Sequence, residues 1–424
     1  MILGYRILTY IVYPIYIVAI FFRKFLKKEH VLRYKEKIFT SYFNVARKRN
    51  SNLIWIHAVS VGELKSVKPI IEQLNKKEIQ ILITTSTLSS NYIANIEFKR
   101  FGNVMHRFIP FDVGFLIENF LDLWKPNFIF LVDSEIWPNL ILKAYEKKIP
   151  ISLINARITK KTYARWKIFP KTAKHIFSLF NFCISSNLET KTYLKKLNVK
   201  KIIYNGNIKF INFVNKTSIS NLNKKILNKV KFWVAASTHE GEDIFFLNTH
   251  NEIKKREKNI ITIIAPRHIH RAKKIEQVSK KFNLKVQILN KNQKIKKNKE
   301  IIILNSFGEL NSYFKYSKSV FFGKSLLKKF KYDGGQSPID AAMLNCKVYH
   351  GPNVSNFKEV YNILKKNNIS KKISNHVDLS RELISDFKLK KNNNYKSLKF
   401  NKMSKKILIK TMNILERHLN NAFN

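Results

Sequence analysis

The chain has 424 residues, of which 45% are hydrophobic and 25% are charged. These fractions exclude a disordered chain, and the length allows two domains that each bury a core. The formal net charge of +51 indicates an anionic partner, although a general bias toward lysine on solvated surfaces is a second explanation. Only two cysteines occur, Cys183 and Cys346, without a CxxC pattern, which favours a reducing compartment over a zinc or disulfide scaffold.

The first segment in chain order, residues 7–22, reads ILTYIVYPIYIVAIFF and contains no charged side chain. A helix needs roughly 20 apolar residues to cross a bilayer, so this segment either spans it with help from flanking arginines or lies in one leaflet. A buried core helix is the alternative. No small-residue cleavage site follows, and the basic flank should remain cytoplasmic. We therefore predict a membrane anchor with a basic flank over residues 1–28.

Beyond the anchor, short β-branched runs alternate with amphipathic helical patterns, which predicts parallel sheets with helices on both faces. The first series of predicted strands comprises residues 52–56, 79–85, 127–132, 151–156 and 181–186. The second series comprises residues 232–237, 259–266, 285–289, 300–304, 319–323 and 346–351.

An Asn/Lys-rich stretch interrupts this alternation and predicts a boundary between two domains. The predicted parts are an N-terminal domain (29–205), an interdomain linker (206–231), a C-terminal domain (232–373) and C-terminal helices (374–424).

Unusual polar clusters follow the ends of many predicted strands. Examples are HAVSVGE after 52–56, DSEIWPN after 127–132, STHEGE after 232–237 and PRH after 259–266. Ligands of doubly wound sheets bind at the carboxyl ends of the strands. The pattern therefore predicts two Rossmann-like domains that face each other across a cleft.

Each cluster also has a purely structural interpretation. Ser60 with Glu63, and Ser237 with Glu240, both match the S-x-x-E capping box at a helix start. Arg267, at the end of an apolar strand, is either paired with a carboxylate or holds a phosphate. The Gly-rich turn DGGQSP, residues 333–338, is either an ordinary turn or an anion site at a helix start.

Several other chemistries are not indicated. The histidines at positions 57, 239, 268 and 270 lack the spacing of metal ligands on a helix, so no metal site is expected. No GxGxxG or GxxxxGK[ST] motif occurs, which weighs against dinucleotide redox chemistry and P-loop hydrolysis.

Taken together, the motifs resemble those of the bacterial 3-deoxy-D-manno-octulosonate (Kdo) transferases of lipopolysaccharide synthesis. The matching stretches in the first half are WIHAVSVGE (55–63), PFDV (110–113), DSEIWPNLI (133–141), INAR (154–157) and GNIKF (206–210). Those in the second half are AASTHEGE (235–242), APRH (265–268), GEL (308–310), GGQSP (334–338) and GPNVSNFKE (351–359).

The resemblance implies a GT-B fold and an inverting, metal-independent transfer of Kdo from CMP-Kdo to the tetra-acylated, bis-phosphorylated lipid A precursor. It implies no cofactor and no nucleic acid, and places the enzyme at the cytoplasmic face of the inner membrane, in contact with anionic lipid. A nucleotide-sugar epimerase of similar fold is the alternative, followed by a basic nucleic-acid-binding protein. Neither explains the apolar N-terminal segment.

The resemblance also assigns site residues. Glu63 is the implied base, while Glu135 and Lys209 would stabilise charge on the sugar ring and on the departing CMP. A helix N-terminus lowers the pKa of Glu63, and desolvation by the bound acceptor would offset this. The implied CMP-binding residues are Pro266, Arg267, Phe307, Gly308, Glu309, Gly335, Gln336, Ser337, Pro338, Asp340 and Glu359.

This chain departs from the family pattern around the nucleotide pocket. The family usually has His-Asn where Gln336 and Ser337 stand, and Glu where Asp340 stands. The preceding loop, LLKKFKYDGG (326–335), also looks longer than usual.

Overall fold

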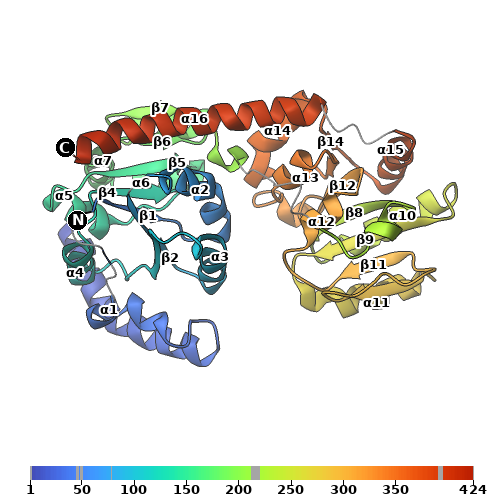
Figure 1. The fold of residues 1–424 in the computed structure, drawn as a ribbon, viewed down its shortest axis with the longest axis horizontal. Coiled ribbons are helices and arrows are strands. Elements are labelled where there is room, and N and C mark those ends of the chain that lie inside the picture. Colours follow the sequence, from blue (N-terminus) through green and yellow to red (C-terminus); the bar gives the residue numbers. More distant parts are fainter. Residues whose placement is uncertain are drawn as a thin grey trace. The chain divides into compact units, whose positions relative to one another are not determined.

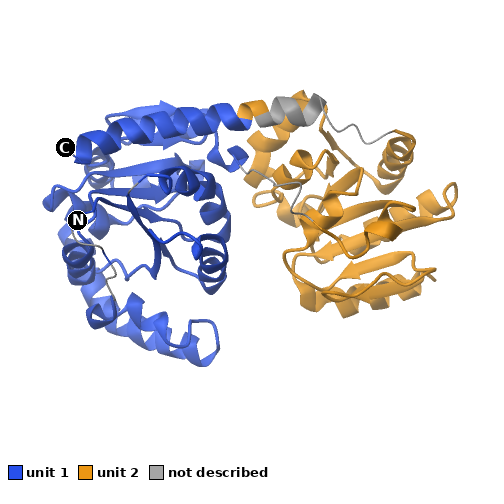
Figure 2. Ribbon diagram, viewed as in Figure 1, with its two compact units in different colours: residues 1–212, 404–424 blue, residues 213–403 orange. Residues whose placement is uncertain are grey.

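The protein folds into two seven-stranded sheets whose strands are all parallel, each flanked by helices (Figure 1). The computed structural model describes residues 2–43, 47, 51–77, 79–211, 220–389 and 395–423. Two compact units contain one sheet each: residues 1–212 with 404–424 form unit 1, and residues 213–403 form unit 2 (Figure 2). The predicted α/β class with two parallel sheets is confirmed.

In unit 1 the strand order is β3-β2-β1-β4-β5-β6-β7. Its strands are β1 (Leu53–His57), β2 (Gln80–Thr85), β3 (Val104–Phe108), β4 (Phe128–Val132), β5 (Ile151–Ala156), β6 (Cys183–Ser185) and β7 (Ile202–Tyr204). Its helices are α1 (Ile2–Phe25), α2 (Val61–Leu74), α3 (Leu88–Phe98), α4 (Gly114–Trp124), α5 (Pro138–Glu146), α6 (Lys160–Lys167), α7 (Pro170–Ser178) and α8 (Leu188–Lys196), with short 3₁₀ turns at Arg33–Lys37, Thr40–Tyr42 and Ile208–Ile211.

In unit 2 the strand order is β10-β11-β9-β8-β12-β13-β14. Its strands are β8 (Lys231–Thr238), β9 (Ile260–Pro266), β10 (Val286–Leu289), β11 (Ile301–Leu304), β12 (Ser319–Phe322), β13 (Lys347–His350) and β14 (Ser370–Lys372). Its helices are α9 (Lys224–Leu227), α10 (Asp243–Lys254), α11 (Ala272–Lys281), α12 (Leu310–Phe314), α13 (Ile339–Met343), α14 (Lys358–Lys366) and α15 (His376–Lys388), and α16 (Tyr395–Phe423) extends from unit 2 into unit 1.

Both sheets bury most of their central strands, which explains the continuous apolar runs in the sequence. Every residue of β1 and β4 is buried in unit 1, as is every residue of β9 in unit 2. Trp55 and Trp124 are fully buried in the core of unit 1, and Trp233 in that of unit 2. These cores hold the carboxyl ends of the strands in fixed positions.

The order of the strands reverses at one place in each sheet. β1 lies between β2 and β4, and β8 lies between β9 and β12. The loops after β1 and β4 therefore flank the switch point of unit 1, and those after β8 and β12 flank that of unit 2. Such switch points are where doubly wound sheets bind ligands.

The described structure divides the predicted linker and C-terminal helices between the units. Residues 206–211 belong to unit 1 and residues 220–231 to unit 2, while 212–219 lie outside the described residues. The end of α16 packs on unit 1, where Asn205 donates to Thr411 Oγ1 at 2.7 Å and the His418 ring stacks on Phe182.

Helix α1 is long and apolar enough to cross a membrane, a criterion of length and composition that some core helices and signal sequences also meet. One side of α1 packs on unit 1. Tyr5 donates to Asp112 Oδ2 at 2.9 Å, Thr9 accepts from Asn139 Nδ2 at 3.1 Å, and the rings of Tyr16 and Phe111 stack at 3.7 Å. The other side is exposed and apolar; it carries Leu3, Ile7, Leu8, Ile11, Ile15, Val18 and Phe22.

Candidate active site

Glu63 lies in the first turn of α2, directly beyond the carboxyl end of β1. Ser60 caps the helix: its hydroxyl accepts from the Glu63 N–H and donates to Glu63 Oε1 at 2.7 Å. The other carboxylate oxygen accepts the Val59 N–H at 2.8 Å. The predicted capping box is thus confirmed, and it fixes the carboxylate at the switch point of unit 1.

The environment of Glu63 suits a proton acceptor. Burial raises the pKa of Glu63, and the negative charges of Glu135 and Asp133 raise it further, against the hydrogen bonds from Ser60 and Val59. The helix N-terminus acts in the opposite direction, but the folded protein already desolvates Glu63, so the net change in its pKa is a rise before any acceptor binds. A raised pKa brings a carboxylate closer to the operating pH of a general base.

Glu135 follows β4 on the other side of the same switch point. The indole N–H of Trp137 donates to Glu135 Oε2 at 2.7 Å. The imidazole of His57 is fully buried, and its Nε2 lies 3.8 Å from the same carboxylate oxygen without a hydrogen-bond partner among the described residues. Its Nδ1 lies 2.8 Å from the Thr84 hydroxyl. The sequence suggests His57 only as a possible metal ligand. Its contact with Glu135 could not be predicted, because it depends on the pairing of β1 with β4.

Lys209 lies in the short 3₁₀ turn Ile208–Ile211 and forms an ion pair with the buried Asp133. Asp133 has a φ of 66°, in the left-handed region that non-glycine residues rarely occupy. Asn155 at the end of β5 has a φ of 55° and accepts the Ile208 N–H. Such strained residues cluster at functional sites. The structure therefore gathers Glu63, Glu135 and Lys209 at one edge of one sheet.

The predicted nucleotide-binding residues all lie in unit 2, after strands β9, β11, β12 and β13. Pro266 ends β9 and is buried, while the adjacent Arg267 is exposed and has no ion pair with any described carboxylate. After β11 come Phe307, whose side chain is 67% exposed, Gly308, and Glu309, whose carboxylate accepts from Ser306.

The remaining predicted residues follow β12 and β13. Gly335 has a φ of +91°, and a Cβ there would lie 2.9 Å from Val354 Cα, so only glycine fits this turn. Gln336 accepts at its backbone carbonyl from the Tyr361 hydroxyl, Ser337 is exposed and Pro338 precedes α13. Asp340 lies in α13 and Glu359 in α14.

The capping box predicted for Ser237 and Glu240 was wrong. Strand β8 continues to Thr238, so α10 begins only at Asp243. The carboxylate that organises this turn is Glu242, which is fully buried. It accepts backbone N–H groups from His239, Lys324, Ser325 and Leu326 at 2.8–3.2 Å, so it joins the two loops at the switch point of unit 2. The sequence pattern S-x-x-E alone does not show that Glu242, rather than Glu240, accepts these N–H groups.

Among the residues that the structure describes, no group of three or more His, Cys, Asp or Glu side chains could hold a metal ion. His239 and His268 do approach each other, with ring centroids 6.1 Å apart, but their neighbours are cationic.

Two parallel α/β units, each with a polar cluster at its switch point, define the GT-B class of nucleotide-sugar enzymes. A solved UDP-GlcNAc 2-epimerase from Neisseria meningitidis has the same fold: the match has a TM-score of 0.56 and 13% identity, and covers 87% of this chain and all of that one. At this identity the likeness shows the fold alone.

Within this class, the chain belongs to the 3-deoxy-D-manno-octulosonic acid (Kdo) transferase family. The family model described as "3-Deoxy-D-manno-octulosonic-acid transferase (kdotransferase)" matches residues 33–212. A probable mitochondrial Kdo transferase of Arabidopsis thaliana is 30% identical over 378 residues, covering 86% of this chain and 82% of that one. The Kdo transferase of Rickettsia bellii is 28% identical, covering 98% and 97%. The chain is therefore a glycosyltransferase that transfers Kdo.

Proposed function

We propose that this enzyme transfers Kdo with inversion from CMP-Kdo to a lipid A precursor. The observation that carries the proposal is the pair of carboxylates, Glu63 and Glu135, at the switch point of unit 1. Inversion requires a base that takes the proton of the attacking hydroxyl on the face opposite the leaving group. Glu63 takes that proton, the freed oxygen bonds to the anomeric carbon, and the bond from that carbon to the CMP phosphate oxygen breaks.

Glu135 and Lys209 stabilise the charges that develop in this step, Glu135 on the sugar ring and Lys209 on the departing CMP. The buried His57 is a positioning residue for Glu135. When Nδ1 of His57 accepts from the Thr84 hydroxyl, Nε2 carries a proton and faces the Glu135 carboxylate. Trp137 donates to the same oxygen, so its N–H holds the carboxylate, while Nε2 of His57 lies 3.8 Å away, beyond hydrogen-bond distance.

Unit 2 supplies the donor site. Arg267 extends from the end of β9 without a carboxylate partner in the described part of the chain, and we propose that it binds the single phosphate of CMP. The exposed ring of Phe307 offers a stacking surface for the base. Asp340 or Glu359 would bind the ribose.

The direct test is to incubate the purified protein with CMP-Kdo and the tetra-acylated lipid A precursor and to measure the lipid by mass spectrometry. We expect a mass increase of one or more Kdo residues, without added metal beyond that used to prepare the donor. An unchanged lipid, with the donor consumed or epimerised, would contradict the proposal.

We further propose that the enzyme lies on the cytoplasmic face of the inner membrane, with α1 in one leaflet rather than across it. Tyr5, Thr9 and Tyr16 spread the contacts of α1 with unit 1 over three turns. A spanning α1 would carry the fully buried Asp112 into the hydrocarbon region, at a high cost for a carboxylate. Lying flat, α1 turns its apolar side to the lipid and keeps Asp112 in the protein.

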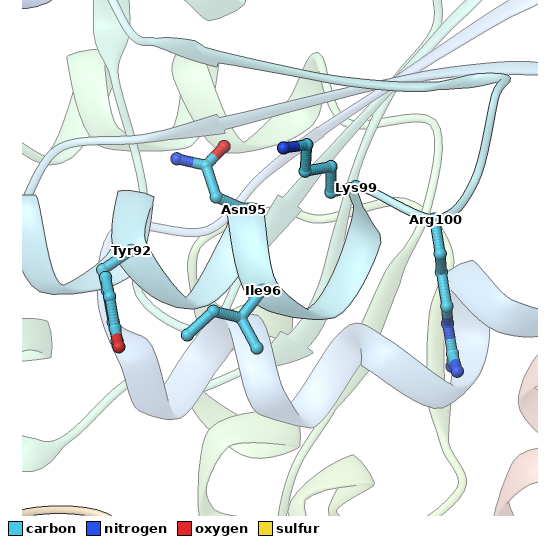
Figure 3. A pocket seen from close by; sticks show the side chains of 5 residues that line it. All are labelled: Tyr92, Asn95, Ile96, Lys99 and Arg100. Atoms are coloured by element: carbon cyan, nitrogen blue, oxygen red, sulfur yellow. The ribbon is translucent and has the colours of Figure 1, made fainter.

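Helix α3 offers a second contact with a lipid surface. A shallow hollow of about 540 Å³ lies along it and is lined by Tyr92, Asn95, Ile96, Lys99 and Arg100 (Figure 3). Tyr92 and Ile96 are 65% and 58% exposed, and two cations follow them. Exposed apolar side chains beside lysine and arginine are typical of surfaces that contact anionic lipid. Ser90 in the first turn of α3 also donates to Val59 O, in the loop that leads to Glu63.

The placement of α1 can be tested by labelling a Leu3→Cys variant in intact cells with a membrane-impermeant maleimide. The two native cysteines are buried, so they give little background. A helix in the cytoplasmic leaflet leaves the new thiol unlabelled in intact cells, and the thiol is labelled only after detergent has dissolved the membrane. Labelling in intact cells would show that α1 spans the membrane.

A further inference from the structure

The switch point of unit 2 contains a pocket that none of the assigned nucleotide-binding residues lines. Its volume is about 460 Å³, and it opens beyond the ends of β8, β9 and β12. The lining consists of His239, Glu240, His268, His270, Arg271, Lys274, Lys329 and Phe330.

The side chains of this pocket are arranged for an anion. Arg271 is only 7% exposed; it is held by an ion pair with Asp243 and by a hydrogen bond to Thr238 O at 2.9 Å, so its guanidinium is fixed in orientation. Glu240, the one acid in the lining, is paired with Lys274. The nearby cations also lower the pKa of His239, after the larger effect of burial. Arg271 and Lys274 are thus each paired with a carboxylate, whereas Lys329 has no carboxylate partner among the described residues.

One wall of the pocket comes from the loop that departs from the family pattern. Lys329 donates to the Glu240 carbonyl at 3.1 Å, and Phe330 meets the His239 ring edge to face at 5.5 Å. Asn353 holds the loop by donating to Leu327 O at 2.9 Å. The loop 326–335 therefore places a lysine and an aromatic ring at the switch point.

We infer that this pocket binds the carboxylate of the acidic donor sugar. The inference rests on the proposed function, in which Arg267 binds the phosphate. Arg267 directly precedes His268 of the pocket, and in an ulosonic acid the carboxylate is attached to the same anomeric carbon as the phosphate. A second group of cations beside the phosphate is therefore where this carboxylate lies, and it distinguishes the acidic sugar from a neutral one.

The test compares Lys329→Ala with Lys328→Ala. Both lysines are exposed and adjacent in the same 3₁₀ turn, but only Lys329 lines the pocket. For each variant, the KM for CMP-Kdo is measured together with the inhibition constant of CMP, which has the phosphate but no carboxylate. We expect Lys329→Ala to raise the KM for CMP-Kdo by roughly tenfold, because one charge-assisted hydrogen bond is lost. The inhibition constant of CMP should change by less than about twofold. Lys329→Arg should restore most of the affinity.

An unchanged KM in Lys329→Ala would overturn the inference, and so would a parallel rise in the CMP inhibition constant, which would show that the pocket holds phosphate. The same values for Lys328→Ala and Lys329→Ala would also overturn it, because they would reflect general charge. These outcomes differ from failure of the proposed function, in which the unaltered enzyme transfers no Kdo.

Discussion

The two switch points have similar backbone topology but different side chains. Beyond β1, unit 1 gathers the carboxylates of Glu63 and Glu135, whereas beyond β8, unit 2 gathers histidine, arginine and lysine side chains. Each also has one acid that accepts backbone N–H groups. Glu63 accepts few of them and is half-buried, while Glu242 is fully buried and accepts four. An acid near the start of the first helix after the switch-point strand is thus the proposed base in unit 1 and joins two loops in unit 2.

The largest effect should follow from Glu63→Gln. Glutamine preserves the shape and most capping contacts but cannot take a proton, and a general base typically contributes about 10²–10⁴-fold. We expect turnover to fall by that factor, measured as Kdo transferred per enzyme in a fixed time, with an unchanged melting temperature. Turnover near that of the unaltered enzyme would reduce Glu63 to a helix-capping residue.

Glu242→Gln should have the reverse profile. Its amide NH₂ would face backbone N–H groups that now meet a carboxylate, and each buried group left unpaired costs about 1–3 kcal/mol. We therefore expect a clear loss of thermal stability, measured by calorimetry, that Glu63→Gln does not show. Equal melting temperatures for the two variants would remove the distinction between the two acids.

The acid limb of the pH–rate profile should respond to Glu135. A base must be ionised, so activity falls as the pH drops through the pKa of Glu63, and this fall lies above the range of an ordinary glutamate because the pKa is raised. Since the charge of Glu135 contributes to that rise, Glu135→Gln should move the limb of the residual activity to lower pH. Glu189→Gln, on an exposed turn of α8, is the matched control. If the acid limb of the profile does not move in Glu135→Gln, the group that limits activity at low pH is not Glu63.

The smallest effect should come from the exposed surface of α3, which we propose contacts lipid. Replacing Tyr92 and Ile96 together by serine removes two exposed apolar side chains, so the fold should be retained. We expect binding to vesicles of anionic lipid, measured by cosedimentation, to weaken several-fold, because α1 remains in place. Binding equal to that of the unaltered protein would exclude α3 from the membrane contact.

The sequence predicted the central strands and the edge strand β10, and missed the edge strands β3, β7 and β14. Central strands such as β1 and β9 are buried on both faces, so their apolar runs are continuous. Edge strands β3 and β14 include His106 and Lys371, and they lack such a run. The return of α16 to unit 1 depends on contacts between residues about 200 positions apart, such as that of Asn205 with Thr411.

The candidate site was predictable where a motif carries the residue. Glu63, Glu135 and Arg267 stand in motifs of the Kdo transferases. Glu242 and Arg271 could not be assigned a place, because their positions depend on where β8 ends and on the pairing of β8 with β9 and β12.

The division of labour between the units is tested most directly by the affinity for CMP, measured by titration calorimetry in Glu63→Gln and Arg267→Ala. If unit 1 supplies the base and unit 2 binds the donor, Glu63→Gln will bind CMP as tightly as the unaltered enzyme, and Arg267→Ala will bind it at least roughly tenfold more weakly. Weakened CMP binding in Glu63→Gln, or unchanged binding in Arg267→Ala, would contradict this account.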